Sequence, residues 1–168
     1  LYMLHTDGGT PVPLLPPEDG WTASDLLFWR GNLLVFQTCY VPGLPESGTS
    51  RVLECALDGS DARPLPYGDG VYASDGRMLY VGANLWDPEN DGLLRAYDEA
   101  GALKWTYELR RLPGVSQPRT VTLYAGLDGR VLIYAHGAGR EHLLYFDAAE
   151  SCEPQPFFDW GKEYLGAR

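Results

Sequence analysis

The chain has 168 residues, 45% of them hydrophobic, and a formal net charge of −10 at pH 7. A chain of this length and composition buries a core, which excludes an intrinsically disordered protein. The acidic balance excludes a nucleic-acid-binding protein, because nucleic-acid affinity depends on clustered Lys and Arg. No apolar run approaches the roughly 18 residues of a membrane-spanning helix, so we expect no membrane insertion.

Apolar stretches rich in Val, Leu, Tyr, Phe and Trp follow one another along the chain, separated by Gly, Pro, Asn and Asp. This pattern predicts an all-β fold of short antiparallel strands. The strands are expected to pair as alternating inner and outer hairpins. We expect inner hairpins at 26–36, 71–81 and 121–133, and outer hairpins near 1–15, 51–66, 93–109 and 142–158.

Turn residues predict how the inner hairpins close. Asp75-Gly76 and Asp128-Gly129 each lie between apolar segments and predict two-residue type I′ turns. In the first inner hairpin, Arg30-Gly31-Asn32 occupies the same place, and there we expect a looser turn.

The sequence also repeats itself, with a period of about 50 residues. The segment 18–25, Glu-Asp-Gly-Trp-Thr-Ala-Ser-Asp, returns at 68–75 as Gly-Asp-Gly-Val-Tyr-Ala-Ser-Asp. Thr-Asp-Gly-Gly at 6–9 is echoed by Leu-Asp-Gly-Ser at 57–60, and weaker echoes begin at Ala96 and Tyr145. A fixed period of this length predicts a repeat architecture rather than an arbitrary β protein.

These segments resemble blades of bacterial β-propellers of the TolB-like and quinoprotein-like kinds, in which an outer strand ends in Asp-Gly. The stretch from Ala96 to Trp105 is similar to the quinoprotein blade motif, which ends in Gly and a docking Trp. It is one residue shorter than that motif between Asp98 and Gly101 and occurs once, so we expect no quinone and no other cofactor.

The resemblance implies a single propeller-like domain over 1–168, built of antiparallel four-stranded blades. The repeats fall near 1–50, 51–92, 93–141 and 142–168, which is about three and a half blades. Closed propellers have roughly four to eight blades. We therefore expect part of a larger propeller or of a homo-oligomer. The first residue is Leu1 and not Met, which suggests a trimmed or processed chain or a piece of a longer protein. We favour an extracytoplasmic location in a bacterium.

The three cysteines show no Cys-x-x-Cys spacing, so the sequence does not predict a zinc site. If 43–50 is a hairpin loop, counting outward from its middle places Cys39 nearly opposite Cys55. Two interpretations remain open: a cross-strand disulfide, or two small buried side chains. We prefer the second.

One acidic loop resembles a calcium-binding loop, because it offers oxygen ligands at alternate positions before a turning glycine. Arg95 and Pro88 count against a cation there, and we interpret the segment as an acidic loop between strands. The histidines, His5, His136 and His142, lack the short spacing of a metal pair. The calcium candidates are Asp87, Glu89, Asp91 and Asp98.

No motif for nucleophilic catalysis is present, since the chain contains no Gly-x-Ser-x-Gly sequence. Paired carboxylates for glycoside hydrolysis would have to come from loop residues, which we interpret as turn formers. We assign no catalytic residue. The carboxylates considered for such a pair are Glu18, Asp19, Glu46 and Asp69.

By analogy with propellers, loops that join strands on one side of the blades form a binding face. Trp21 and Trp86 on this face would either stack on sugars or peptides or pack between blades. We expect a non-enzymatic scaffold or sensor that binds a protein, a small molecule or a glycan. The alternative is a hydrolase or glycan-active enzyme whose site is completed by further blades or a partner chain. The expected face comprises Asp19, Trp21, Tyr67, Asp69, Trp86, Asp87, Arg119, His136 and Arg140.

Overall fold

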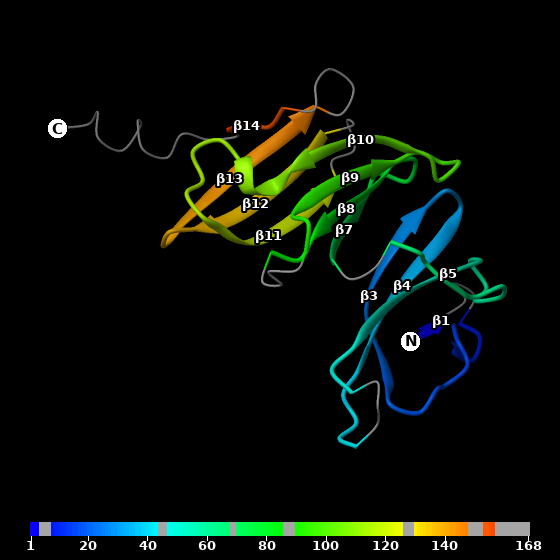
Figure 1. Cartoon of the computed structure of the whole chain (residues 1–168). Helices are drawn as coiled ribbons and strands as arrows, with labels where there is room; N and C mark the ends of the chain where they lie inside the picture. The colour runs from blue at the N-terminus through cyan, green and yellow to red at the C-terminus, as the bar shows by residue number, and fades with distance from the viewer. Residues whose placement is uncertain are drawn as a thin grey trace. The chain divides into compact units, whose positions relative to one another are not determined.

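The computed structural model of the chain describes residues 1–3, 8–43, 47–67, 70–85, 90–125, 130–147 and 153–156. Its strands form three four-stranded sheets and one two-stranded sheet, all antiparallel (Figure 1). The described residues contain no α-helix and a single 3-10 turn, Leu109–Arg111. The prediction of an all-β antiparallel fold is confirmed. The chain divides into two compact units, 1–69 and 70–168, and each is described by itself.

The first unit contains the two-stranded sheet and the first four-stranded sheet. In the four-stranded sheet each strand pairs with the next one along the chain, so an inner hairpin is followed by an outer one. The predicted outer hairpins near 1–15 and 51–66 and the inner hairpin at 26–36 are present. The strands are β1 (Tyr2–Met3), β2 (Val12–Pro13), β3 (Trp21–Trp29), β4 (Asn32–Cys39), β5 (Ser50–Cys55) and β6 (Arg63–Pro64).

The second unit repeats this order in two further four-stranded sheets, so the remaining predicted hairpins are also present. The first strands of the three four-stranded sheets begin at Trp21, Gly70 and Pro118, a step of roughly 50 residues. The second sheet consists of β7 (Gly70–Ser74), β8 (Leu79–Ala83), β9 (Leu93–Tyr97) and β10 (Leu103–Glu108). The third consists of β11 (Pro118–Ala125), β12 (Arg130–Gly137), β13 (Arg140–Asp147) and β14 (Gln155–Pro156).

The inner turns differ from the prediction. Trp29 pairs with Asn32, and Arg30 and Gly31 between them have φ of 46° and 81°, so the tight two-residue turn is here. At Asp75-Gly76 the strands end earlier, at Ser74 and Leu79. The Asp75 carboxylate accepts hydrogen bonds from the two backbone amides that follow Gly76, which stabilises a longer loop. Asp128 and Gly129 lie outside the described residues.

Gly59 and Gly101 close equivalent outer turns. In the first sheet, Asp58 accepts a hydrogen bond from the amide of Ser60, and the amide of Gly59 bonds to the carbonyl of Ala56, each at 2.9 Å. In the second sheet, Asp98 accepts from the amide two residues later, and the amide of Gly101 donates to the Asp98 carbonyl, again at 2.9 Å. The backbone turn is thus repeated with a glycine at the same position, whereas Asp58 and Asp98 occupy different positions in it.

The register of β4 and β5 shows that the expected proximity of Cys39 and Cys55 is wrong. Cys55 lies opposite Leu33, and the amide of Cys39 donates to the carbonyl of Thr49. The loop between β4 and β5 is centred earlier in the sequence than the middle of 43–50. The two cysteines therefore lie at opposite ends of the sheet. Both are buried free thiols, as the preferred interpretation predicted.

The larger core lies in the second unit, where the second and third sheets pack together. Tyr80 and Leu94 of the second sheet and Phe146 of the third are fully buried in it. Trp105 packs between the two sheets, with its ring centre 5.5 Å from that of Phe146 and 6.1 Å from that of Tyr80. The first unit has a smaller buried cluster of Leu14, Val35 and Cys55.

Candidate functional site

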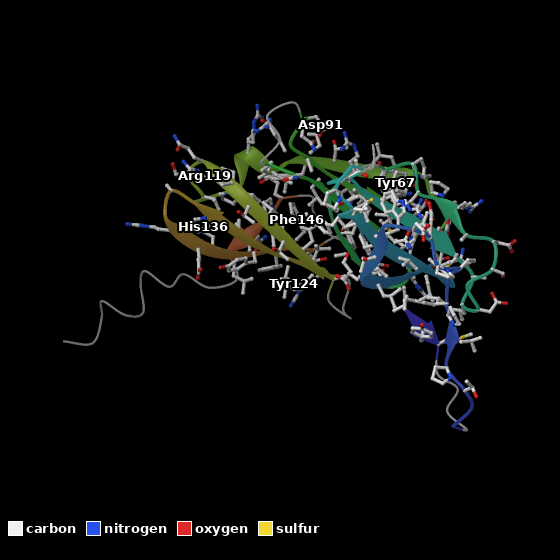
Figure 2. All side chains as sticks on the ribbon, turned by 90° about the horizontal axis from the view of Figure 1, so that it is seen from below. Tyr67, Asp91, Arg119, Tyr124, His136 and Phe146 are labelled. Carbon is white, nitrogen blue, oxygen red and sulfur yellow. The ribbon has the colours of Figure 1, made fainter. Side chains whose placement is uncertain are left out.

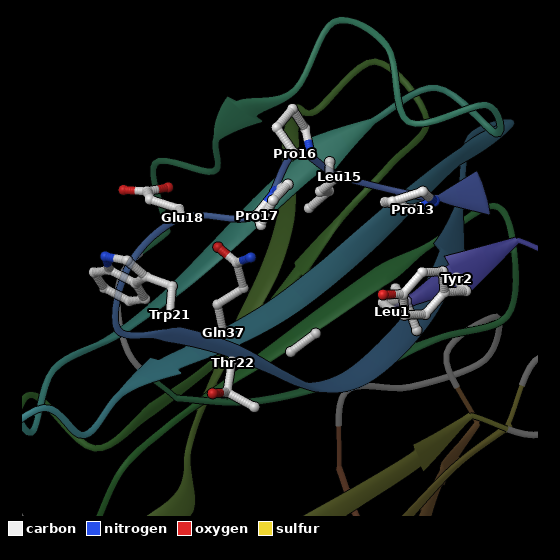
Figure 3. A pocket seen from close by; sticks show the side chains of 11 residues that line it. Leu1, Tyr2, Pro13, Leu15, Pro16, Pro17, Glu18, Trp21, Thr22 and Gln37 are labelled. Carbon is white, nitrogen blue, oxygen red and sulfur yellow. The ribbon is translucent and has the colours of Figure 1, made fainter. Parts of the chain in front are cut away.

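A pocket of about 250 Å³ opens in the first unit (Figure 3). Its walls come from the two-stranded sheet, from the proline-rich segment that follows β2, and from the beginning of β3. Gln37 of β4 also lines it. We call this cavity the Trp21 pocket. Its lining residues are Leu1, Tyr2, Pro13, Leu15, Pro16, Pro17, Glu18, Trp21, Thr22, Ala23 and Gln37.

The chain forms this wall for local reasons. Proline fixes φ, so the Pro16-Pro17 pair restricts the segment that leads into β3. A turn then brings Glu18 beside Trp21, closed by a 3.1 Å hydrogen bond from the Trp21 amide to the Glu18 carbonyl. Gly20 within this turn has φ of 86°, a conformation that glycine adopts without strain.

Arg51 of β5 holds three residues of the pocket at once. Its guanidinium carbon lies 3.9 Å from the centre of the Trp21 ring. Its Nε donates to Oε1 of Gln37 at 2.8 Å, and its two terminal nitrogens bind the two carboxylate oxygens of Glu18. Gln37 and Arg51 face each other across β4 and β5, so the sheet register brings them together.

This contact also sets the orientation of the Gln37 amide, because the oxygen and nitrogen of an amide are distinguished by their hydrogen-bond partners. Since Oε1 accepts from Arg51, the NH₂ group lies on the other side. Figure 3 shows this nitrogen on the side of Gln37 away from Trp21. Gln37 is only 7% exposed, so the pocket has a fixed hydrogen-bond donor at its floor.

The electrostatics of the pocket follow from the same ion pair. The hydrogen bond from Arg51 lowers the pKa of the Glu18 carboxyl below its ordinary value of 4.5. Glu18 is therefore ionised at neutral pH and its charge is compensated by the guanidinium. It is the single formally charged side chain among the lining residues. The pocket thus offers paired charges, neutral donors and aromatic surface.

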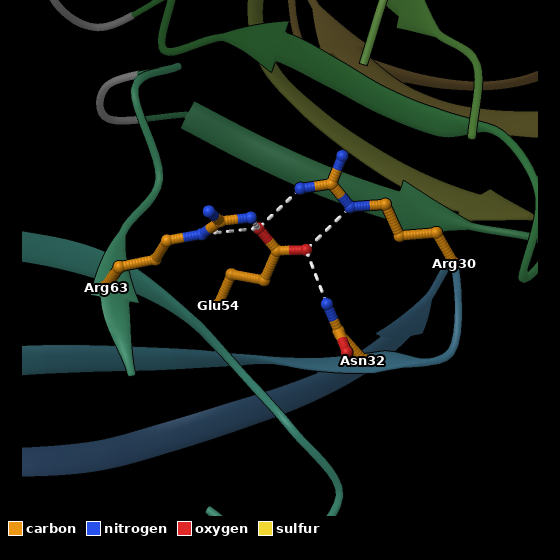
Figure 4. Close-up of polar contacts among 4 residues, drawn as sticks. All are labelled: Arg30, Asn32, Glu54 and Arg63. Carbon is orange, nitrogen blue, oxygen red and sulfur yellow. Dashed lines mark hydrogen bonds and ion pairs between the residues drawn. The ribbon is translucent and has the colours of Figure 1, made fainter. Parts of the chain in front are cut away.

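A second polar cluster surrounds Glu54, whose side chain is 3% exposed (Figure 4). Arg30 donates two hydrogen bonds of 2.6 Å to its carboxylate, Asn32 donates one of 2.9 Å, and Arg63 donates two of 3.0 and 3.3 Å. The hydrogen bond from Arg30 contributes most to lowering the pKa of Glu54 to about 2. The cluster ties the inner turn to β5 and β6, and we interpret it as a stabilising network.

The predicted binding residues of the first unit do not come together. Trp21 is the first residue of β3, whereas the ring of Tyr67 packs edge-on against Trp29, the last residue of β3, with ring centres 6.5 Å apart. A nine-residue strand separates its ends by roughly 25 Å. Asp19 precedes Trp21 in the turn but does not line the pocket.

Three predicted residues of the second unit do come together, at one end of the third sheet. His136 pairs with Thr120 and with Glu141, and Arg140 pairs with Gly137. Arg119 lies at the irregularity next to Thr120, near His136 (Figure 2). Arg119 and Arg140 are exposed. Asp69, Trp86 and Asp87 lie outside the described residues, as do Glu46 and His5.

The two described carboxylates of the calcium candidate, Asp91 and Asp98, form contacts within the chain. Asp91 forms an ion pair with Arg95 and accepts a 3.0 Å hydrogen bond from the amide of Leu93. Asp98 accepts two backbone hydrogen bonds and lies 3.9 Å from the ammonium of Lys104. Glu89 is not described. Within the described ranges no three His, Cys, Asp or Glu residues are grouped to hold a metal ion.

No family model matches the sequence, and no curated protein matches it. No helix in the described part of the chain is long and apolar enough to cross a membrane.

Sequence reasoning identified Trp21 and considered Glu18, but it missed Gln37 and Arg51. Gln37 and Arg51 lie opposite each other on adjacent strands. This pairing could be predicted only if the register of the strands were known.

Proposed function

We propose that the chain is a non-enzymatic binding module of β-propeller type and that the Trp21 pocket is its ligand site. The observation that carries this proposal is Arg51, which holds Trp21, Glu18 and Gln37 around an open cavity. A binding site gains affinity when its polar groups are fixed before the ligand arrives. Gln37 and Arg51 are fixed by the sheet.

Several features support a propeller of which this chain supplies three blades and half of another. Three four-stranded sheets follow in order, each made of successive neighbours, and the first two share an equivalent outer turn with a glycine at the same position. In the second unit the first strands β7 and β11 lie against each other, as the innermost strands of adjacent blades do. Further blades would come from a longer chain or from other subunits.

The chemistry of the pocket favours binding over catalysis. Glycoside hydrolysis needs a carboxylic acid whose pKa is raised so that it can donate a proton. The pKa of Glu18 is shifted in the opposite direction, because Arg51 stabilises the carboxylate. The ionised Glu18 serves as a hydrogen-bond acceptor for a ligand.

A thermal-shift screen with a chemically diverse set of small molecules tests the proposal. A ligand that binds the folded chain raises its Tm. We expect compounds that raise the Tm of the wild type and of Tyr40→Ala but not of Trp21→Ala. Tyr40 is the matched control, because it is an exposed aromatic residue of the first unit outside the pocket. Stabilisation that survives Trp21→Ala, or rapid turnover of the stabilising compounds, contradicts the proposal.

A further inference from the structure

We infer that the ligand of the Trp21 pocket is a neutral sugar ring, either free or at the end of a glycan. This inference rests on the proposed binding function and goes on to name the chemical class of the ligand. Four properties of the pocket carry it: its size, its charge balance, its mixture of donors and acceptors, and its aromatic residues.

The size of the pocket limits the ligand to one ring. Its volume is about 250 Å³. Pockets for drug-sized ligands measure roughly 300–1,000 Å³, so this cavity is below that range. A single hexose fits the scale, and further sugar units of a longer glycan would remain outside the pocket.

The charge balance favours a neutral ligand. Glu18 is paired with Arg51, and both of its carboxylate oxygens accept hydrogen bonds from the guanidinium. The other lining side chains carry no formal charge. A carboxylate or phosphate on the ligand would have to displace Glu18 from Arg51, and an ammonium group would meet the competing guanidinium.

The hydrogen-bonding groups distinguish a sugar from a proline-rich peptide, the other ligand that aromatic pockets commonly take. Gln37 presents an NH₂ donor and Glu18 an acceptor. Sugar hydroxyls both donate and accept, so they satisfy both groups. A proline segment offers carbonyl acceptors without N–H groups and leaves the Glu18 carboxylate without a ligand donor.

The aromatic residues suit a ring with apolar C–H faces and polar edges. Tyr and Trp combine an apolar ring with one polar group. Arg51 covers one face of Trp21, which leaves the ligand the other face or the edge. Tyr2 lines the pocket and is 69% exposed, so its ring is accessible to a ligand.

The test is an NMR titration of the full chain with methyl glycosides of glucose, galactose, mannose and N-acetylglucosamine, alongside glucuronate and a proline hexapeptide. A single exposed ring gives weak binding, so we expect at least one neutral glycoside to bind with a Kd of about 1 mM and to shift the Trp21 indole signal. Glucuronate should bind no better than the glycosides, and the hexapeptide more weakly.

Variants of the full chain locate the site. Trp21→Ala should weaken glycoside binding at least about tenfold, a change of 1.4 kcal/mol. Tyr2→Ala changes an exposed side chain that lines the pocket, so it should also weaken binding and serves if Trp21→Ala does not fold. Tyr40→Ala should bind like the wild type. Melting curves confirm that each variant is folded.

Two results overturn the inference with different consequences. If no glycoside binds saturably but the hexapeptide or another compound shifts the Trp21 signal, the sugar assignment fails and the binding function stands. If no compound of either kind shifts that signal, the sugar assignment and the proposed site fail together. Glycoside binding that Tyr2→Ala and Trp21→Ala leave unchanged also overturns the assignment.

Discussion

The guanidinium of Arg51 lies over the ring of Trp21, with its central carbon 3.9 Å from the ring centre. The two residues come from strands that are not neighbours, since β4 lies between β3 and β5. Attraction between a guanidinium and an aromatic face holds such pairs together. Here the same guanidinium also binds Glu18, so one side chain links the sheet to the wall of the pocket.

Replacing Arg51 should release Glu18. We predict that Arg51→Ala raises the pKa of the Glu18 carboxyl toward its ordinary value of 4.5, because the lowered pKa results mainly from the hydrogen bond with Arg51. The side-chain NH₂ signal of Gln37 should shift in the same variant, since its oxygen loses the Arg51 donor. NMR titration of the Glu side chains measures the pKa of Glu18, and a ¹H–¹⁵N spectrum of the variant reports the Gln37 signal.

The control for this prediction is Arg77→Ala, which removes an exposed arginine paired with Glu99 in the second unit. It should leave Glu18 and Gln37 unchanged. A Glu18 pKa that is the same in the wild type and in Arg51→Ala would show that the ion pair does not persist in solution.

The buried carboxylate of Glu54 should make stability depend on pH. Its pKa in the folded chain is about 2 and its ordinary value is 4.5, so the folded state stabilises the ionised form. The contribution is therefore fully present above pH 4.5 and is lost as the pH falls toward 2. We predict that Glu54→Gln destabilises the chain at pH 7 by about 2–3 kcal/mol, because Arg30 and Arg63 lose their charged partner.

Denaturant unfolding at several pH values measures this effect. The difference between the wild type and Glu54→Gln should shrink from pH 5 to pH 2.5, whereas Glu108→Gln should cost little at any pH, because its ion pair with Arg111 is exposed. A pH-independent difference for Glu54→Gln would contradict the ionised buried state.

Gly59 holds the first outer turn against the segment that carries the pocket. A Cβ atom at Gly59 would lie 1.6 Å from the carbonyl oxygen of Leu14, and φ at Gly59 is +83°. We predict that Gly59→Ala destabilises the chain by about 2–4 kcal/mol, since backbone must move and the conformation is left-handed. It should also weaken ligand binding, because Leu15 and Pro16 of the pocket wall follow Leu14 directly.

Gly48 provides the matched control. Its φ is +85°, but a Cβ atom there would meet nothing within 4 Å. Gly48→Ala should therefore cost only the backbone strain, about 1–2 kcal/mol, and leave binding intact. Equal losses in the two variants, measured by denaturant unfolding, would show that contact with Leu14 does not hold the turn.

Tyr80 has the one buried side-chain polar atom in the described residues without a hydrogen-bond partner. Burial raises the pKa of its hydroxyl, and the nearby charge of Asp75 adds to this effect. We predict that Tyr80→Phe is neutral or stabilises the chain by up to about 1 kcal/mol, because it removes a desolvated hydroxyl. Tyr107→Phe should instead destabilise by a similar amount, since it removes a 2.8 Å hydrogen bond to the Arg111 carbonyl. Thermal unfolding of both variants compares them, and a large loss for Tyr80→Phe contradicts the assignment.

The hairpins and their order could be predicted from the sequence, because alternating apolar residues and Asp, Gly and Asn turns are local signals. The register could not. Counting from the middle of an expected 43–50 loop placed Cys39 near Cys55, whereas the amide of Cys39 bonds to the carbonyl of Thr49. Because the register could not be predicted, the pairing of Gln37 with Arg51 could not be predicted either.

The site was predictable in part for the same reason. Trp21 was expected on a binding face by analogy with the loops on one side of propeller blades. The sequence could not show that Tyr67 lies away from Trp21. The distance between the two residues depends on where Tyr67 packs, and it packs against Trp29. Long-range packing of this kind leaves no local signal in one sequence.

The most direct test of the account is to map ligand binding on the tryptophan side chains. The chain has five tryptophans, and the indole N–H signal of Trp21 can be assigned with Trp21→Phe. During NMR screening with mixtures of small polar fragments, we predict that binding fragments shift the Trp21 signal first and most. Fragments that bind while shifting only other indole signals would contradict the claim that the Trp21 pocket is the ligand site.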